Sequence, residues 1–276
     1  MPELPEVETV RRTLVPRVVG ERVASVTVRD ARLRFPVDPE LLTALTVGRK
    51  IIGVRRRAKY LLVDFEEGSV LLLHLGMTGR IRFVKHDAPF EKHDHVAWHF
   101  SSKIDMRFND PRRFGMAEAF AKADEDDHPR LAHLGIEPLG DELTAERFAE
   151  LARGLAKPIK NFLMDGSKVV GVGNIYACEA LNIAQISPLK QAGRIGRGHW
   201  QKLTAAVRYI LSRAIEEGGT TLRDFVDAEG VTGSYATRLL CYGREREKCL
   251  TCEKGTIKRI VMAGRSTFYC SACQRR

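Results

Sequence analysis

The chain opens with a segment whose apolar residues have helical spacing. They recur every three or four positions, at Leu4, Val7, Val10, Leu14 and Val18. Such spacing forms one face of an amphipathic helix, and a glycine such as Gly20 commonly ends one. The pattern predicts an N-terminal helix, with Pro2 at or just before its first turn.

From Val23 to about Ala121 the pattern changes to short alternating or continuous apolar runs. These runs are VASVTV, KIIGVRRR, KYLLVDF, SVLLLHL, RIRFV, HVAWHF and GMAEAF. Turn-forming residues such as Glu67-Gly68 and Asn109-Asp110-Pro111 separate them. Short strands divided in this way are typical of a β-sandwich or barrel.

A polar, acidic and proline-containing stretch, Lys122 to Pro138, follows the predicted strands and indicates a domain boundary. After it the apolar spacing becomes helical in two segments, at Phe148, Leu151 and Leu155 and then at Trp200, Leu203, Val207, Ile210, Ala214 and Ile215. The second segment runs to Gly218-Gly219. We therefore predict an α+β protein: an N-terminal helix and β-sandwich over residues 1–130, a mostly α domain over 131–241, and a cysteine-rich unit over 242–276.

Composition narrows the choice of partner. A length of 276 residues suffices for two domains, and 45 Lys and Arg against 35 Asp and Glu give a formal charge of +10. This excess favours a polyanion such as DNA or RNA. A membrane is the weakest alternative, because no apolar run approaches the ~18 residues of a spanning helix. The first ten residues carry three glutamates and no basic region, so we expect no secretory signal and a cytosolic protein.

Four cysteines near the C-terminus have the spacing of a metal site. Cys249-x2-Cys252 is followed, after seventeen residues, by Cys270-x2-Cys273. This arrangement predicts one tetrahedral Zn²⁺, with four unliganded cysteines as the alternative. The zinc would be structural, because four thiolates leave no open position for water. Between the pairs, TIKRIVMAGRSTFY reads as a hairpin around Ala263-Gly264 that presents Arg265 at its turn.

The residues at the chain start admit two interpretations. Pro2 with Glu3 and Glu6 suits the beginning of a helix, where proline and acidic groups are favoured. Removal of methionine before proline would instead expose a secondary amine. An α-amine of pKa ~7.7–8 is neutral on the order of 10² more often at pH 7 than a lysine of pKa ~10.4. A secondary amine attacking a sugar C1′ gives a permanently charged iminium, which acidifies the C2′ protons and favours elimination.

Eight motifs in order across nearly the whole chain resemble the formamidopyrimidine-DNA glycosylase family. They are MPELPEVETVRR, RRAKYLL, HLGMTGR, KHDHV, NDPRRFG, VVGVGNIYACEAL, GGTTLRDF and the cysteine tail with AGRSTFYC. The resemblance implies a bacterial base-excision-repair enzyme, a helix-two-turns-helix motif in the α domain, a zinc hairpin, and a monomer that binds damaged double-stranded DNA between its domains. It also implies excision of 8-oxoguanine and formamidopyrimidines, followed by β,δ-elimination at the abasic site.

The resemblance assigns roles to individual residues. Pro2 matches the Schiff-base nucleophile, Glu3 the acid that assists sugar-ring opening, Lys59 the proton donor for β-elimination and Arg265 the donor for δ-elimination. A second group matches the family's DNA contacts. Its members are the void-filling Met77, Arg112 and Phe114 and the backbone-contacting His74, His93, Lys160 and Asn174.

Most of these residues also have ordinary structural interpretations. Met77 and Phe114 could pack in a core, Arg112 and Lys59 could be solvated charges, and Asn174 could be only a helix N-cap. The two histidines could simply be hydrogen-bonded within the fold.

Three features depart from the family pattern or leave a role open. Leu155 stands where many relatives have a basic residue, so Arg153 or Lys157 would have to supply that phosphate contact. The gap between the cysteine pairs is one residue longer than usual, which can change the direction in which the Arg265 side chain points. The loop from Asp227 to Tyr235 is expected to contact the flipped base.

Two other functions compete with this one. An endonuclease VIII-like enzyme would share the architecture but prefer oxidised pyrimidines. Leu4 favours an enzyme for oxidised purines, because endonuclease VIII-like enzymes typically have glycine at this position. A non-catalytic DNA-binding protein would use the helical domain and zinc hairpin only for docking, and docking requires neither Glu3, nor Lys59, nor a removable Met1 before Pro2.

Overall fold

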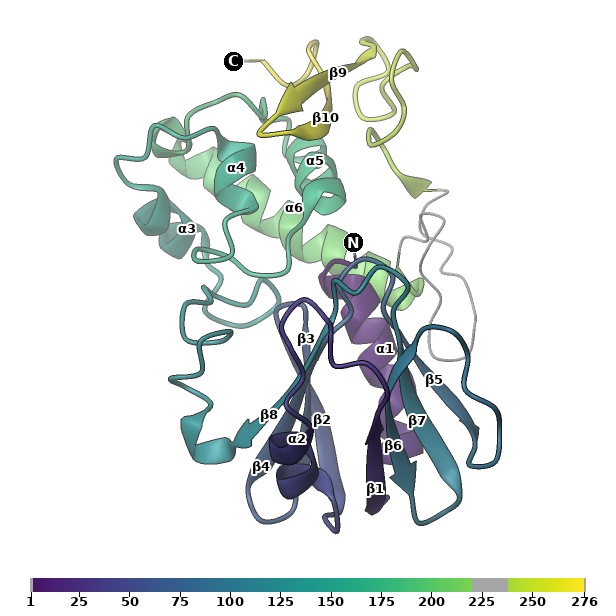
Figure 1. The fold of residues 1–276 in the computed structure, drawn as a ribbon. Coiled ribbons are helices and arrows are strands. Elements are labelled where there is room, and N and C mark those ends of the chain that lie inside the picture. The colour runs from purple at the N-terminus through teal and green to yellow at the C-terminus, as the bar shows by residue number, and fades with distance from the viewer. Residues whose placement is uncertain (1, 220–237, 276) are drawn as a thin grey trace. The chain divides into compact units, whose positions relative to one another are not determined.

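The computed structural model describes residues 2–219 and 238–275, so the predicted base-contacting loop and most of the GGTTLRDF motif lie outside the described residues. The described part divides into two compact units (Figure 1). The first contains residues 2–132 and 218–219, and the second residues 133–217 and 238–275. The division after residue 132 falls within the acidic stretch Lys122 to Pro138.

The first unit is a β-sandwich with two α-helices. The helices are α1 (Leu4–Val18) and α2 (Pro39–Thr46). The strands are β1 (Val23–Val28), β2 (Ile51–Arg57), β3 (Tyr60–Phe65), β4 (Ser69–His74), β5 (Arg80–Lys85), β6 (Asp94–Phe100), β7 (Ile104–Asn109) and β8 (Met116–Ala121). They form two antiparallel sheets, in the orders β1-β6-β7-β5 and β2-β3-β4-β8. A short 3-10 helix, η1 (Lys122–Asp124), follows β8.

One hydrophobic core joins both sheets and α1. Alternate residues of the strands point inward, including Trp98 on β6, Phe108 on β7 and Leu71 on β4. The apolar face predicted for the first helix belongs to the same core, and α1 packs against β2. At the three-residue β3–β4 turn, residues 66–68, Glu67 and Gly68 have positive φ of 65° and 73°, which lets the chain reverse direction tightly. The predicted N-terminal helix and β-sandwich are therefore confirmed.

Two elements of this unit are missing from the runs predicted above. Helix α2 was missed although Asp38 caps it, accepting a hydrogen bond from the Leu41 amide, and proline follows directly. Strand β7 was missed although its apolar and polar residues alternate. Its polar Asp105 and Arg107 are fully buried rather than solvated, which an alternating pattern alone does not indicate.

The second unit is mostly helical and ends in a β-hairpin. Its elements are α3 (Ala145–Ala152), α4 (Ile159–Leu163), α5 (Asn174–Ile183), the 3-10 helix η2 (Ala192–Arg194), α6 (Arg197–Glu216), β9 (Ile257–Met262) and β10 (Arg265–Cys270). Helix α6 packs against α3 and α5, around a core that includes Phe148, Phe162 and Trp200. The helical segment from Trp200 and the hairpin around Ala263-Gly264 are confirmed. The segment with Phe148 and Leu151 is helical too, but α3 ends at Ala152, before Leu155.

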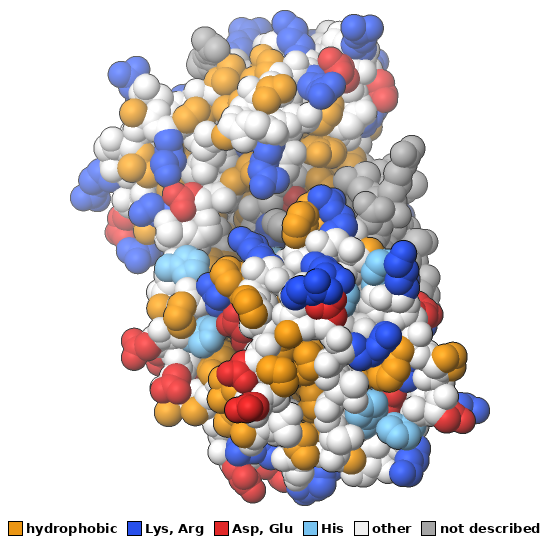
Figure 2. All heavy atoms as spheres, in the orientation of Figure 1, with side chains coloured by type: hydrophobic (Ala, Val, Ile, Leu, Met, Phe, Trp, Pro, Cys, Tyr) orange, Lys and Arg blue, Asp and Glu red, His pale blue; other side chains and the backbone are white. Residues whose placement is uncertain are grey.

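Among the described residues, no helix is both long and apolar enough to cross a membrane. On the face drawn in Figure 2, Lys and Arg side chains are spread over both units.

Candidate active site and nucleic-acid interface

The start of α1 holds the predicted nucleophile in a defined place. Pro2 is buried and directly precedes Glu3, the N-cap residue. Glu3 and Glu6 form a capping box, in which the Glu3 amide donates to Glu6 Oε2 at 2.8 Å. The helix therefore begins where predicted, and its positive dipole end lies at Pro2 and Glu3.

A buried ion pair ties this helix to the turn that carries Lys59. Arg56 on β2 donates from Nε to Glu8 Oε2 at 3.3 Å and from Nη1 to the carbonyl of Ala58 at 3.1 Å. Burial alone would raise the pKa of Glu8, but hydrogen bonds from Arg11 and Arg12 and the charge of Arg56 hold it below its ordinary value. Glu8 is thus charged, and Arg56 fixes the Ala58–Lys59 turn to α1.

The predicted void-filling residues lie on two loops that pack closely together. Gly76, with φ of +61°, has no room for a side chain, because a Cβ would lie 2.4 Å from the backbone carbon of Phe114. Met77 is partly exposed next to it. The Arg112 guanidinium lies 4.8 Å from the centre of the Phe114 ring, and that ring is 45% exposed. Core packing is therefore excluded for Phe114, and a solvated position is confirmed for Arg112.

Asp110 organises this pair of loops from a fully buried position. Its Oδ1 accepts from the Thr78 hydroxyl at 2.5 Å and from the Arg112 amide at 3.3 Å, and its Oδ2 accepts from the Gly115 amide at 2.7 Å. The Asp110 amide donates to the carbonyl of His93 at 3.0 Å. The carboxylate therefore joins the segments that carry Met77, Arg112 and Phe114, and the backbone amide of the same residue adds the segment with His93.

Replacing Asp110 with asparagine is expected to cost about 2 kcal/mol of unfolding free energy, because the amide group cannot accept all three hydrogen bonds and leaves a buried donor unsatisfied. Urea denaturation at pH 7 measures the change. Asp87→Asn, at an exposed position, is the matched control and should stay within about 0.5 kcal/mol of the parent. Equal stability of the two variants would contradict the role given to Asp110.

His74 is a buried, neutral histidine at the end of β4. Its Nδ1 accepts from the Gly76 amide at 3.0 Å, so the proton of the neutral ring is on Nε2. Burial, followed by the charges of Lys59 and Arg34, lowers the pKa of His74 to about 4. A role in DNA binding would rest on hydrogen bonding, because the ring carries no charge at neutral pH.

This lowered pKa predicts a pH-dependent stability. In the unfolded chain His74 protonates near pH 6.5, whereas in the folded chain it protonates near pH 4. Between these values protons bind the unfolded state preferentially, so stability falls as the pH is lowered from 6.5 towards 4, by about 2 to 3 kcal/mol from this residue. Urea denaturation at pH 7 and pH 4.5 should show a smaller loss for His74→Gln than for the parent. An identical loss in both proteins would refute the assignment.

In the second unit, Lys160 and Asn174 form one hydrogen-bonded cluster. Lys160 is buried, and its Nζ donates to Asn174 Oδ1 and to Thr267 Oγ1, each at 2.6 Å. Asn174 Nδ2 donates to the Ser266 carbonyl at 2.9 Å and to Tyr242 Oη at 3.2 Å. Helix α5 does begin at Asn174, but its N-cap is Gly173, so the interpretation of Asn174 as an N-cap is wrong.

The residues offered as substitutes for the basic contact at Leu155 differ in their surroundings. Lys157 Nζ donates to Asp165 Oδ2 at 2.7 Å, so its charge is paired within the fold. Arg153 is exposed at the end of α3. Arg153 is therefore the better placed of the two for a phosphate.

The four cysteines fit a zinc ion. Their sulfur atoms all lie within 4.8 Å of one another, with 3.9 Å between Cys249 and Cys273 and 3.7 Å between Cys252 and Cys270. Tetrahedral Zn²⁺ with Zn–S bonds of about 2.3 Å places its sulfurs about 3.8 Å apart. Backbone amides of Lys254 and Gly255 lower the pKa of Cys252 to about 6, whereas burial raises the pKa of Cys270 and of Cys273, so the positive charge of the metal is needed to keep all four as thiolates. These four side chains hold one structural zinc ion.

Arg265 lies where the hairpin pattern predicted. Ala263 and Gly264 have positive φ and form the turn, and Arg265 begins β10 opposite Met262. Its side chain is exposed. Sequence reasoning gave no individual role to Arg56, Asp110 and Thr267, although they stand in the quoted motifs RRAKYLL, NDPRRFG and AGRSTFYC.

Comparison with known proteins shows the family to which the chain belongs. Three family models match in succession: the formamidopyrimidine-DNA glycosylase N-terminal domain over residues 1–117, the H2TH domain of that enzyme over 134–226, and a zinc finger found in FPG and IleRS over 246–276. The chain belongs to the formamidopyrimidine-DNA glycosylase family. Proteins of that name from Syntrophotalea carbinolica and Acidithiobacillus ferrooxidans are 49% and 47% identical to it over 275 residues, with 100% of each chain covered.

Solved structures of the family agree with this membership. The Lactococcus lactis enzyme in complex with abasic-site DNA matches with a TM-score of 0.90 and 34% identity, over 99% of this chain and 100% of that one. MutM in complex with carbocyclic 8-oxo-G DNA matches with a TM-score of 0.90 and 35% identity over 100% of both chains. The expected helix-two-turns-helix domain and zinc finger are thereby confirmed, and the chain is a DNA glycosylase of base excision repair.

Proposed function

We propose that this glycosylase removes oxidised purines, 8-oxoguanine and formamidopyrimidines, from double-stranded DNA through a Schiff base on Pro2, and then cleaves the strand by β,δ-elimination. The main support is the position of Pro2 at the start of α1, directly before the capping pair Glu3 and Glu6. The turn that carries Lys59 is joined to the same helix, because Arg56 hydrogen-bonds both Glu8 and the Ala58 carbonyl.

The reaction begins once methionine has been removed and Pro2 has a free secondary amine. The neutral nitrogen attacks C1′ of the damaged nucleotide, and the bond from C1′ to the base breaks. Glu3 gives a proton to the ring oxygen O4′ as the sugar opens, and the nitrogen loses its own proton to become a charged iminium. The base departs with the electron pair of the broken bond and takes up the proton that the nitrogen loses, so the covalent intermediate keeps only the opened sugar.

Elimination follows from the charge on that iminium. Loss of a C2′ proton lets the C3′–O bond break, and loss of a second proton lets the C5′–O bond break, so the strand is cut on both sides of the sugar. Lys59 acts as the proton donor in the first elimination and Arg265 in the second.

The target base must leave the stack, and exposed side chains fill the space. Phe114 supplies an aromatic wedge, Arg112 a cation that hydrogen-bonds the orphaned base, and Met77 a flexible apolar filler. His74, His93, Lys160 and Asn174 contact the phosphate backbone. The partner is damaged duplex DNA, bound by a single copy of the chain in the bacterial cytosol.

The relatives' complexes favour purine lesions but do not exclude pyrimidines. The Lactococcus lactis enzyme has been solved with Fapy-dG DNA and with DNA containing an oxidised pyrimidine. In this chain, Leu4 favours an enzyme for oxidised purines.

Incubation with duplexes containing 8-oxoguanine or thymine glycol, with and without borohydride, tests the proposal. We expect faster excision of 8-oxoguanine and a reduced protein–DNA adduct. Faster excision of thymine glycol would indicate the endonuclease VIII-like function, and binding with no adduct on either DNA would indicate a non-catalytic DNA-binding protein.

A further inference from the structure

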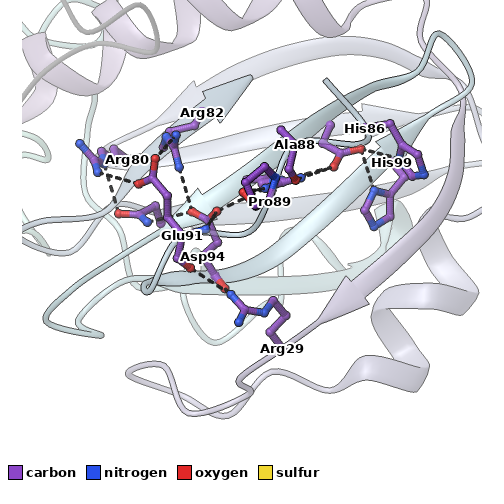
Figure 3. Close-up of polar contacts among 12 residues, drawn as sticks. Arg29, Arg80, Arg82, His86, Ala88, Pro89, Glu91, Asp94 and His99 are labelled. Carbon is purple, nitrogen blue, oxygen red and sulfur yellow. Dashed lines mark hydrogen bonds and ion pairs between the residues drawn. The ribbon is translucent and has the colours of Figure 1, made fainter. Parts of the chain in front are cut away.

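A group of metal-ligating side chains lies outside the candidate site, on the outer face of the sheet β1-β6-β7-β5. His99 on β6 and Asp105 on β7 are direct cross-strand partners, and His86 follows β5. The Nδ1 atoms of His99 and His86 lie 2.7 Å and 2.9 Å from the same oxygen, Oδ1 of Asp105 (Figure 3). Two imidazole nitrogens and one carboxylate oxygen therefore converge on one point.

The spacing of these three atoms suits a small divalent ion. Bonds of about 2.0–2.2 Å to a tetrahedral metal separate its ligand atoms by about 3.3 Å. Here the three ligand atoms all lie within 4.8 Å of one another, and each histidine nitrogen is within 3 Å of the carboxylate oxygen. To reach the separation of about 3.3 Å, each histidine nitrogen would have to move about half an ångström away from the carboxylate oxygen.

Neighbouring side chains already orient the two buried ligands. The second carboxylate oxygen of Asp105 accepts from Arg107 Nη2 at 2.9 Å, which leaves Oδ1 directed at the histidines. His99 Nε2 lies 2.8 Å from Thr27 Oγ1, which fixes the plane of the ring. Such outer hydrogen bonds are the usual support of metal-binding histidine and carboxylate groups.

The third ligand gives access from solvent. The His86 side chain is 49% exposed, whereas Asp105 is fully buried. Three protein ligands leave a fourth position, which water can fill on the exposed side. His86 opens the segment 86–93 that covers this face, where Arg107 also donates to the carbonyls of Ala88 and Pro89 (Figure 3).

We propose that His86, His99 and Asp105 form a second metal site, separate from the four cysteines, that takes a divalent ion of the zinc, cobalt or nickel class. Imidazole nitrogen favours these ions over Mg²⁺ and Ca²⁺, which prefer oxygen ligands alone. Binding joins segment 86–93 to strands β6 and β7, so the ion stabilises the sandwich rather than taking part in the reaction.

Cobalt titration of the full chain, with its cysteine site filled by zinc, tests the site. We expect one equivalent of Co²⁺ to bind with weak visible d–d bands and without the intense thiolate charge-transfer band that replacement of the cysteine-bound zinc would produce. Elemental analysis should still find one zinc per chain, and bound Co²⁺ should raise Tm.

Variants identify the ligands. His86→Gln lies at a half-exposed position, and it should abolish both the bands and the rise in Tm. Thr27→Val, which removes only the outer hydrogen bond, should weaken Co²⁺ affinity by about tenfold. His199→Gln, at an exposed histidine of α6, is the matched control and should bind like the parent. Failure of the parent to bind a second metal, or binding by His86→Gln equal to that of the parent, would overturn the proposal.

Discussion

Adding one residue in front of Pro2 is expected to lower the yield of borohydride-trapped adduct with 8-oxoguanine DNA by at least about 100-fold. The addition converts the secondary amine into an amide, which is not a nucleophile. The α-amine of the added residue lies about 3.8 Å further along the chain, so it is out of place for attack on C1′. A misplacement of 1 Å can already cost about 100-fold, nearly 3 kcal/mol in the barrier, and a lysine at pH 7 is neutral on the order of 10² less often than an α-amine. Single-turnover trapping on a denaturing gel measures the yield.

Two further variants separate the nucleophile from the proton donor. Pro2→Ala still permits removal of methionine and keeps an α-amine, so it should form an adduct but cleave the strand more slowly, because its imine can lose the positive charge. Lys59→Met should trap as well as the parent and lose mainly the elimination step. If the extended chain binds abasic-site DNA and traps like the parent while Lys59→Met does not trap, then Lys59 is the nucleophile and the Pro2 assignment fails.

Local sequence patterns predicted most of the fold because most elements are locally encoded. The apolar face of α1 and the hairpin turns at Glu67-Gly68 and Ala263-Gly264 depend on residues close together in the chain. Strand β7 was missed because its character depends on tertiary structure: Asp105 and Arg107 become buried only when segment 86–93 covers them. Helix α2 carried a local signal, Asp38 followed by proline, and could have been predicted.

In the candidate site too, some residues could be predicted from local sequence and others could not. Pro2 and Glu3 could be proposed from their place at the chain start, and the zinc ligands from their spacing. The residues that position the site act across long separations, as when Arg56 joins Glu8 to the Lys59 turn. Asp110 reaches Thr78, 32 positions away, and Lys160 reaches Thr267, 107 positions away. No periodicity records such pairs, so only the structure reveals them.

Removing the zinc is expected to unfold the β9–β10 hairpin. The hydrophobic cluster that it forms with its neighbours is small: among the described residues its buried members besides cysteines are Ile257 and Phe268, with Tyr242 and Ala272 partly buried against them. Metal binding in structural zinc sites supplies about 10–16 kcal/mol of apparent free energy at pH 7, far more than such a cluster provides. Because β10 also supplies Thr267 and Ser266 to the Lys160–Asn174 cluster, loss of the hairpin should remove those contacts too.

Hydrogen exchange before and after chelation measures this effect. Amides of residues 257–270 should lose their protection while those of the β-sandwich keep theirs, because the sandwich has its own core. Cys249→Ser should reproduce the loss without a chelator, because it removes one of the four thiolates. Ser271→Ala, at an exposed position between the ligands Cys270 and Cys273, is the control and should retain both zinc and protection. A hairpin that stays protected after stoichiometric zinc loss would mean that its side-chain packing, together with the hydrogen bonds from Lys160 and Asn174, suffices to fold it without metal.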